Sequence, residues 1–161
     1  MKNNYKNIKY IITNYIEDIS VPIQDYNVHL GVFIEPYLTY ILDGKKTWES
    51  RFSINKTAPF GKVFPNDLLL IKKSGGPIVA IAIIQKVLSF RLDQATYKKI
   101  KKDYSELLCI HDPSFWEMKS TASYCSIMRL DKLIKIKPCD FVKKDRRGWI
   151  VYKDFSHILR L

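Results

Sequence analysis

The sequence has few of the residues from which metal and disulfide sites are built. Among its 161 residues are three cysteines and three histidines, and neither kind is clustered. Cys109, Cys125 and Cys139 form no C-x-x-C pair, which argues against a disulfide framework and against a structural zinc site. We therefore expect reduced thiols, buried as small apolar side chains, in a cytoplasmic protein.

Signatures of common catalytic and cofactor sites are also missing. His29, His111 and His157 form no H-E-x-x-H pattern, so metal catalysis is not expected. Neither G-x-G-x-x-G nor a P-loop occurs, and no G-x-S-x-G elbow is present. The sequence therefore gives no support for a bound dinucleotide or nucleoside triphosphate, and no cofactor is expected.

Long apolar runs are absent too. No stretch reaches about 18 uncharged apolar residues, so no transmembrane helix is expected. The N-terminal stretch carries Glu17 and Asp18 and lacks a small-residue cleavage site, so we interpret it as a helix and not as a signal peptide. The length is that of one compact domain, and no contact with a membrane is expected.

Acidic residues are scarce relative to basic ones. Asp and Glu number 16 against 27 Lys and Arg, which gives a formal net charge of +11. Small and strongly basic domains commonly meet phosphate, either in nucleic acid or in anionic lipid. Lys, Ile, Asn and Tyr are all abundant, and AT-rich codons encode all four, so codon bias is an alternative source of part of this charge. The charge favours contact with nucleic acid without locating a site.

Apolar periodicity predicts an N-terminal helix. Residues 5–19 place isoleucines and tyrosines at three- and four-residue spacings, which is typical of an amphipathic helix with one apolar stripe. Pro22 then disfavours helix at the residue before it. We predict that residues 1–22 form a helix packed on a main domain of residues 23–161. The alternative is a helix that binds a partner.

The rest of the chain mixes strands with helices. Strands are predicted at residues 28–34, 67–74, 78–90, 124–137 and 149–152, an extended segment at 46–52, helices at 35–44, 93–110 and 113–120, and a short helix or tail at 154–161. The second and third of these strands form a hairpin with a continuous apolar run, as in a buried strand or a barrel. This order predicts an α+β fold, a mixed and partly closed β-barrel with helices at its ends.

The stretch "ILDGKKTWESRF" follows the second predicted helix. Gly44 suits the left-handed position that ends a helix, and Lys45 and Lys46 then lie beside the last helical carbonyls, where cations are favourable. Lys46 can contact phosphate as a point charge. If burial depresses its pKa, it can instead act as a nucleophile or an acid.

The extended segment after Gly44 groups its side chains by alternation. Alternate residues of a strand share a face, which places Thr47, Glu49 and Arg51 on one face and Lys46, Trp48 and Ser50 on the other. Glu49 and Arg51 are then close enough for an ion pair or for one cleft. An arginine fork grips phosphate or a base edge, and a glutamate accepts from an exocyclic amine or serves as a general base.

The segment "PYLTYILDGKKTWESRF" closely resembles the signature of the ASCH domain, a family of PUA-like β-barrels. The pattern G-x-K-T-x-E-x-R is matched by Gly44, Lys46, Thr47, Glu49 and Arg51. The hairpin "LLLIKKSGGPIVAIAII" is similar to the next hairpin of the family. The resemblance covers roughly residues 28–153 and leaves residues 1–27 outside it.

This resemblance implies a protein that binds RNA or a modified nucleotide in a cleft lined by the G-x-K-T-x-E-x-R segment. Some small bacterial members hydrolyse the amide of acetylated cytidine and others are ribonucleases. In the amidohydrolases the lysine at the position of Lys46 is catalytic, but Glu49 stands here where they use a threonine. A further catalytic glutamate lies in their next helical region, where this chain offers Glu106 and Glu117.

The leading hypothesis is therefore a binding protein with a basic cleft, lined by Gly44, Lys45, Lys46, Thr47, Glu49, Arg51, Ser74 and Gly75. The last two belong to the turn "KKSGG", which can present backbone amides to an anion. Contacts to a nucleic-acid backbone are predicted at Lys143, Lys144, Arg146 and Arg147. The alternatives are a hydrolase with Lys46 and Glu49 as catalytic residues, and a protein-interaction adaptor that uses the N-terminal helix.

Overall fold

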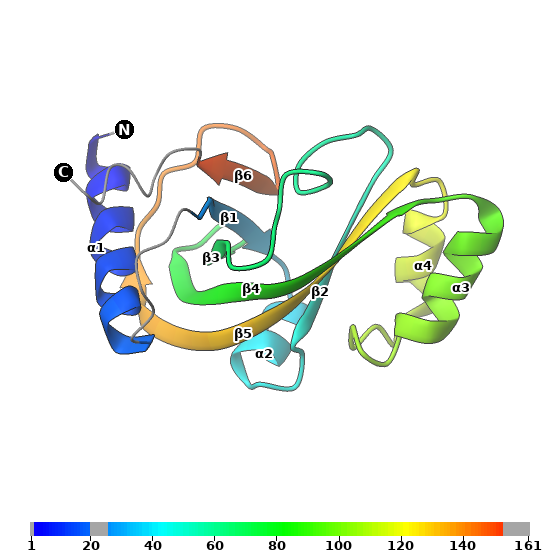
Figure 1. Cartoon of the computed structure of the whole chain (residues 1–161), viewed down its shortest axis with the longest axis horizontal. Coiled ribbons are helices and arrows are strands. Elements are labelled where there is room, and N and C mark those ends of the chain that lie inside the picture. The colour runs from blue at the N-terminus through cyan, green and yellow to red at the C-terminus, as the bar shows by residue number, and fades with distance from the viewer. Residues whose placement is uncertain (1, 20–25, 153–161) are drawn as a thin grey trace.

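Six strands form one sheet that curls into a half-barrel in the computed structural model, which describes residues 2–19 and 26–152 (Figure 1). The strands are β1 (Val28–Phe33), β2 (Trp48–Ser53), β3 (Leu68–Lys73), β4 (Ile78–Arg91), β5 (Tyr124–Cys139) and β6 (Trp149–Tyr152). Their order is β2-β5-β4-β3-β1-β6, with β1 parallel to β3 and the other neighbouring pairs antiparallel. This mixed sheet confirms the predicted partly closed barrel, including its hairpin of β3 and β4.

The helices of the described residues are α1 (Lys2–Ile19), α2 (Tyr37–Leu42), α3 (Gln94–Tyr104) and α4 (Pro113–Lys119). Helix α1 covers one end of the half-barrel, and α3 and α4 lie beyond its other end, where β4 and β5 project (Figure 1). The architecture confirms the predicted α+β class with an N-terminal helix and flanking helices. The helix or tail predicted at 154–161, which includes His157, lies outside the described residues.

Helix α1 packs on the sheet through its predicted apolar stripe. Ile8, Ile12 and Tyr15 are buried in one hydrophobic cluster with residues of the sheet. The Tyr15 hydroxyl also donates a hydrogen bond of 2.6 Å to the carbonyl of Lys132. The predicted apolar stripe therefore faces the sheet in this structure.

Strand β5 is longer than the strand that pairs with its outer edge. It spans 16 residues, but β2 pairs with it only from Tyr124 to Arg129. The Leu130 N–H then donates to the carbonyl of Thr47, at 2.7 Å, just before β2 begins. Beyond Leu130, no strand among the described residues pairs with this edge of β5, which runs free beside α1.

Helix α2 is shorter than predicted but ends as expected. It spans residues 37–42 instead of 35–44, with Pro36 immediately before it. Gly44 follows with φ of +76°, the left-handed conformation that favours glycine at the end of a helix. The chain then folds back, because the Lys46 N–H donates to the carbonyl of Tyr40 at 3.0 Å.

Helix α3 also differs from its prediction, at its C-terminal end. The Asp93 carboxylate caps it by accepting from the Thr96 N–H at 2.7 Å. Periodicity predicted a helix to residue 110, yet α3 ends at Tyr104 and a series of turns follows. In these turns Cys109 has φ of +55° and the Leu108 carbonyl accepts a hydrogen bond from Lys46. A tertiary contact thus overrides the local helical preference.

Three further findings concern groups that were discussed from the sequence. No helix of the described residues is long and apolar enough to cross a membrane. Within the same ranges, no group of three or more His, Cys, Asp or Glu side chains is placed to hold a metal ion. The three cysteines are free thiols, but only Cys125 is fully buried, whereas Cys109 and Cys139 are partly exposed.

Candidate functional site

Lys46 lies in the turn between α2 and β2. The residue is buried, with 3 % of its surface exposed. Its Nζ donates to the Leu108 carbonyl at 2.5 Å. The Glu49 carboxylate lies 3.6 Å from the same nitrogen, and the Tyr37 ring centroid lies 5.5 Å from it. Three segments therefore meet at this amine: α2, the start of β2 and, far away in sequence, the turns after α3.

Burial changes the chemistry of this amine. Removal from water lowers the pKa of Lys46, and the carboxylate of Glu49 opposes that shift. A lysine with a lowered pKa loses its proton more readily and becomes a better nucleophile or base. The ammonium form has three N–H donors, and the Leu108 carbonyl accepts from only one of them.

The strand alternation predicted from the sequence is wrong for Lys46. It placed Lys46 on the face opposite Glu49, whereas the two side chains form an ion pair. The reason is that β2 begins only at Trp48, so Lys46 belongs to the turn and strand alternation does not apply to it. The predicted proximity of Glu49 and Arg51 does hold, because the Arg51 Nε donates to the Glu49 carboxylate at 3.1 Å.

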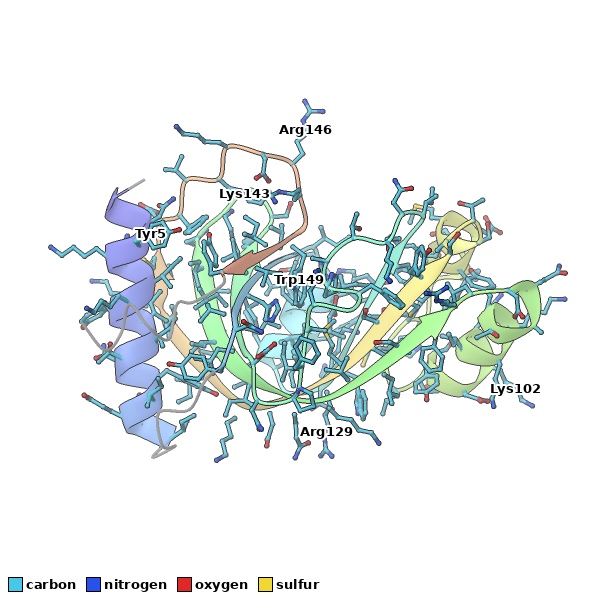
Figure 2. The ribbon with its side chains drawn as sticks, turned by 45° about the horizontal axis from the view of Figure 1, so that its top comes forward. Tyr5, Lys102, Arg129, Lys143, Arg146 and Trp149 are labelled. Carbon is cyan, nitrogen blue, oxygen red and sulfur yellow. The ribbon has the colours of Figure 1, made fainter. Side chains whose placement is uncertain are left out.

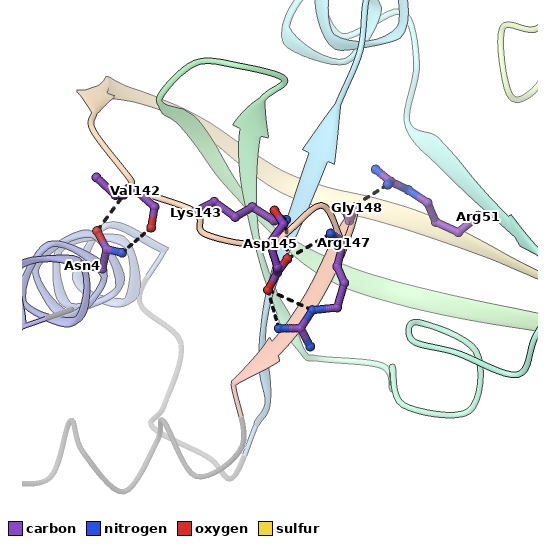
Figure 3. Close-up of polar contacts among 7 residues, drawn as sticks. All are labelled: Asn4, Arg51, Val142, Lys143, Asp145, Arg147 and Gly148. Atoms are coloured by element: carbon purple, nitrogen blue, oxygen red, sulfur yellow. Dashed lines mark hydrogen bonds and ion pairs between the residues drawn. The ribbon is translucent and has the colours of Figure 1, made fainter.

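Arg51 makes further contacts that span the sheet. Its Nη2 donates to the Val32 carbonyl at 2.8 Å and its Nη1 donates to the Gly148 carbonyl at 3.2 Å (Figure 3). Val32 belongs to β1 and Gly148 directly precedes β6, whereas Arg51 belongs to β2 at the other end of the strand order. Arg51 thus links the two ends of the sheet and closes the half-barrel.

Two aromatic rings hold the Arg51 guanidinium in place. Its carbon lies 4.7 Å from the ring centroid of Phe33 and 5.1 Å from that of Trp149. Such cation–π contacts favour arginine over lysine. The sequence predicted a ligand contact for Arg51, and the structure shows three hydrogen bonds from its guanidinium to protein acceptors.

A hollow of about 300 Å³ lies directly beside the motif. Its lining residues are Ile41, Leu42, Asp43, Gly44, Lys46, Thr47, Leu130, Leu133 and Lys135. The volume is at the lower end of the range for small-molecule pockets. The G-x-K-T part of the motif therefore lines this hollow, whereas Glu49 and Arg51 are not among its lining residues.

Two backbone amides of the turn that contains Ser74 and Gly75 have acceptors within the protein. The Ser74 N–H donates to Phe33, and the Gly76 N–H donates to Lys73, so these amides already have acceptors. The turn instead directs carbonyls at a lysine, because the Lys72 Nζ donates to the carbonyls of Gly76, at 2.6 Å, and Lys73. No described hydrogen bond or ion pair joins this turn to Lys46.

The basic loop of residues 143–147 is partly neutralised by its own acid. The Asp145 carboxylate accepts from the Lys143 Nζ at 2.7 Å and from the Arg147 guanidinium at 2.7 and 3.0 Å (Figure 3). These contacts, with the Arg147 bonds foremost, lower the pKa of Asp145. Lys144 and Arg146 are exposed, and Arg146 extends away from the sheet in Figure 2. Lys144 and Arg146 therefore remain exposed to solvent, whereas Lys143 and Arg147 form ion pairs with Asp145.

Neither glutamate proposed from the resemblance reaches the buried lysine. The Glu106 side chain is 92 % exposed and lies 4.0 Å from His111, and Glu117 is exposed on α4. No described contact joins either residue to Lys46. Lys45, the other predicted ligand contact beside the motif, is also exposed and does not line the hollow.

The structure adds residues that sequence reasoning missed. Ser126 is fully buried on β5, directly opposite Arg51 in the register, and its Oγ has no hydrogen-bond partner among the described residues. A buried hydroxyl without a partner is costly, so it is a feature that a ligand can explain. A serine inside an apolar strand was visible in the sequence, but the Leu108 carbonyl beside Lys46 carried no sequence signal.

Comparison with known proteins places the fold. No protein-family model and no curated protein sequence matches the chain. The crystal structure of ASCH from Zymomonas mobilis does match it, with 10 % sequence identity and a TM-score of 0.60, over 83 % of this chain and 92 % of that one. The chain has an ASCH-like fold.

Two variants of the same Zymomonas mobilis protein match equally well. One has a tyrosine replaced by phenylalanine and the other a serine replaced by alanine, with TM-scores of 0.60 and 0.61 over 81 % of this chain at 10 % identity. At this identity the likeness concerns the fold alone. The ASCH-like fold is thus the one that the motif around Lys46 had indicated.

Proposed function

We propose that this protein binds RNA or a modified nucleotide in the hollow beside α2, with Lys46 as the central contact. The observation that carries this proposal is the position of the Lys46 amine. Lys46 lines the hollow, and its amine is buried with a hydrogen bond to the Leu108 carbonyl and an ion pair with Glu49, which leaves at most one N–H donor without an acceptor. A buried ammonium ion next to a cavity is suited to a phosphate or carbonyl oxygen of a ligand.

The surroundings of Lys46 support an anionic or strongly polar ligand. Lys135 adds a second cation to the lining, and Thr47 adds a hydroxyl, whereas Asp43 contributes one acid. Gly44 also lines the hollow, and its φ of +76° is a conformation that favours glycine. The formal net charge of +11 attracts polyanions to the whole surface. The ASCH-like fold agrees with the family expectation of RNA binding.

Glu49 and Arg51 have supporting roles in this proposal. Glu49 holds the Lys46 amine by their ion pair, and Arg51 holds Glu49 by a hydrogen bond of 3.1 Å. Arg51 in turn is fixed by the carbonyls of Val32 and Gly148. The motif therefore presents one lysine to the ligand and uses its other charged residues to position that lysine.

A hydrolase is the second candidate, and the lowered pKa of Lys46 favours it. A neutral amine at this position can attack a carbonyl carbon or remove a proton from water, with the Glu49 carboxylate nearby to accept the proton. The unpartnered hydroxyl of Ser126 is a further reactive group on the same face as Arg51. The substrates to test are acetylated cytidine and RNA.

Binding measurements with matched variants test the proposal. Lys46→Met removes the charge but keeps an unbranched side chain, and Lys62→Ala removes one lysine from an exposed loop. We expect Lys46→Met to lose affinity for short RNAs or nucleosides at least tenfold, while Lys62→Ala binds as the wild type. Equal affinity of Lys46→Met and wild type, with both folded by thermal melting, would refute the site. Turnover that persists in Lys46→Met would refute the hydrolase.

A further inference from the structure

A second and larger hollow, of about 650 Å³, lies between α1 and the distal part of β5. Residues of β5 and Ile81 of β4 form its floor, and α1 forms its wall. Hydrogen bonds join α1 to the segments beside it. Asn4 exchanges two with the backbone of Val142 (Figure 3), and the Tyr15 hydroxyl donates one to the Lys132 carbonyl. Both ends of α1 are thus attached, and the groove between them is a formed feature.

Three lysines stand among the apolar side chains that line the groove, such as Ile11, Ile134 and Ile136. Lys6, Lys135 and Lys137 all line it, and none of them takes part in an ion pair among the described residues. Asp18 and Asp140 also belong to the lining, so the groove carries an excess of one positive charge, three cations less two acids. Unpaired lysines along a groove are suited to the phosphates of a nucleic-acid strand.

An aromatic side chain lies exposed on the wall of the groove. Tyr10 belongs to α1, lines the groove, and is 69 % exposed. Its neighbours Ile8 and Ile12 are buried, so packing against the sheet does not account for the position of Tyr10. Exposed aromatic rings between cations are the usual stacking surfaces for the bases of single strands.

The groove adjoins the hollow of the candidate site. Lys135 lines both, so a ligand at Lys46 and a ligand in the groove meet at one residue. We propose that an RNA strand bound at the candidate site continues through this groove, with Lys6, Lys135 and Lys137 on its phosphates and Tyr10 under a base. This inference rests on the proposed function and extends it from one nucleotide to a strand.

An extended peptide is the other occupant that a free strand edge can take. The lysines of β5 and Pro138 argue against it, since charges and proline on an edge oppose the addition of a further strand. Protection of the β5 edge against a further strand does not explain why Lys6 and Tyr10 line the groove, because both residues belong to α1. The observations therefore favour a nucleic-acid strand.

Fluorescence anisotropy with single-stranded RNAs of about 3 and about 12 nucleotides tests this inference. The groove variant combines Lys6→Ala, Tyr10→Ala and Lys137→Ala, all at exposed positions. The control combines Lys62→Ala, Phe64→Ala and Lys98→Ala, which remove the same kinds of exposed side chain elsewhere.

We expect the groove variant to bind the longer RNA at least about fivefold more weakly than wild type and the shorter RNA equally well. The slope of log affinity against log salt for the longer RNA should fall by about 1.4, because two phosphate contacts are lost. The control variant should match the wild type with both RNAs.

Unchanged affinity of the groove variant for the longer RNA would overturn the inference. Binding of an extended peptide in the groove that leaves the affinity for RNA unchanged would also overturn it. In that case loss of the shorter RNA in Lys46→Met would still uphold the proposed function. A wild-type protein that binds neither RNA overturns both. Loss of the longer RNA in the groove variant, with Lys46→Met binding as the wild type, would refute the site at Lys46 and with it the continuous path, and would leave only an RNA contact in the groove.

Discussion

Replacement of Arg51 by alanine should destabilise the fold, because this side chain closes the half-barrel. The substitution removes a charged hydrogen bond to Glu49 and two hydrogen bonds to backbone carbonyls on the far side of the sheet. It also removes the contacts to the two aromatic rings. Glu49, at 7 % exposure, is then left with Lys46 as its remaining ion-pair partner.

Loss of one partner of a buried charge pair costs about 3–5 kcal/mol. Lys46 remains beside Glu49, and the Gly148 carbonyl lies in an exposed loop where water can reach it. We therefore expect a loss of about 3 kcal/mol, at the low end of this range. Arg51→Lys should recover only part of this loss, since an ammonium ion cannot make the same set of contacts as the guanidinium fork.

Urea unfolding followed by circular dichroism measures this loss as a change in the free energy of unfolding. Arg129→Ala is the matched control, because Arg129 is an exposed arginine on the neighbouring strand β5 (Figure 2). We expect this control to remain within about 0.5 kcal/mol of wild type. A loss below about 1 kcal/mol in Arg51→Ala would refute the assignment of Arg51 to barrel closure.

Three more predictions follow from buried polar groups. Asp67→Asn should lower the free energy of unfolding in urea by about 2 kcal/mol. The Asp67 carboxylate accepts from two backbone N–H groups and from the buried His29 Nε2 at 2.8 Å, and an amide would direct its own N–H at some of these donors. A change below about 0.5 kcal/mol would contradict this. Burial lowers the pKa of Lys46 below its usual 10.5, so just below pH 10.5 the unfolded chain binds more protons than the folded protein. The contribution of Lys46 to the free energy of unfolding therefore rises with pH in that window. The Lys46→Met variant should lose this rise, and parallel curves of stability against pH for the two proteins would disprove the prediction. Burial raises the pKa of Cys125 to about 12, so its thiol should react with a thiol reagent only after unfolding, and modification in the folded protein at the rate of Cys139 would show that the strand opens.

The sequence indicated the fold well because its main signals are local. The apolar runs of β3 and β4 predicted their hairpin, and Gly44 predicted the end of α2. Helix ends were less accurate where a tertiary contact decides them. Periodicity continued past Tyr104, but the Leu108 carbonyl bonds to Lys46 and the chain leaves the helix.

The candidate site was predictable in part. The resemblance to the ASCH signature put Lys46, Glu49 and Arg51 in one cleft, and they form a chain of contacts, although strand alternation had placed Lys46 on the opposite face. Their separate roles depend on residues far away in the sequence, such as the Gly148 carbonyl that receives Arg51. The burial of Lys46 beneath the turns after α3 depends on the whole fold and no local pattern encodes it.

The central claim is that RNA binds in the hollow beside α2 and contacts Lys46. Backbone amide NMR during titration with a single-stranded RNA of about 3 nucleotides tests it most directly. The proposal predicts that the largest chemical-shift changes fall on Gly44, Lys46, Thr47, Leu130 and Leu133, which line this hollow. Changes confined to the basic loop of residues 143–147, with these amides unaffected, would contradict it.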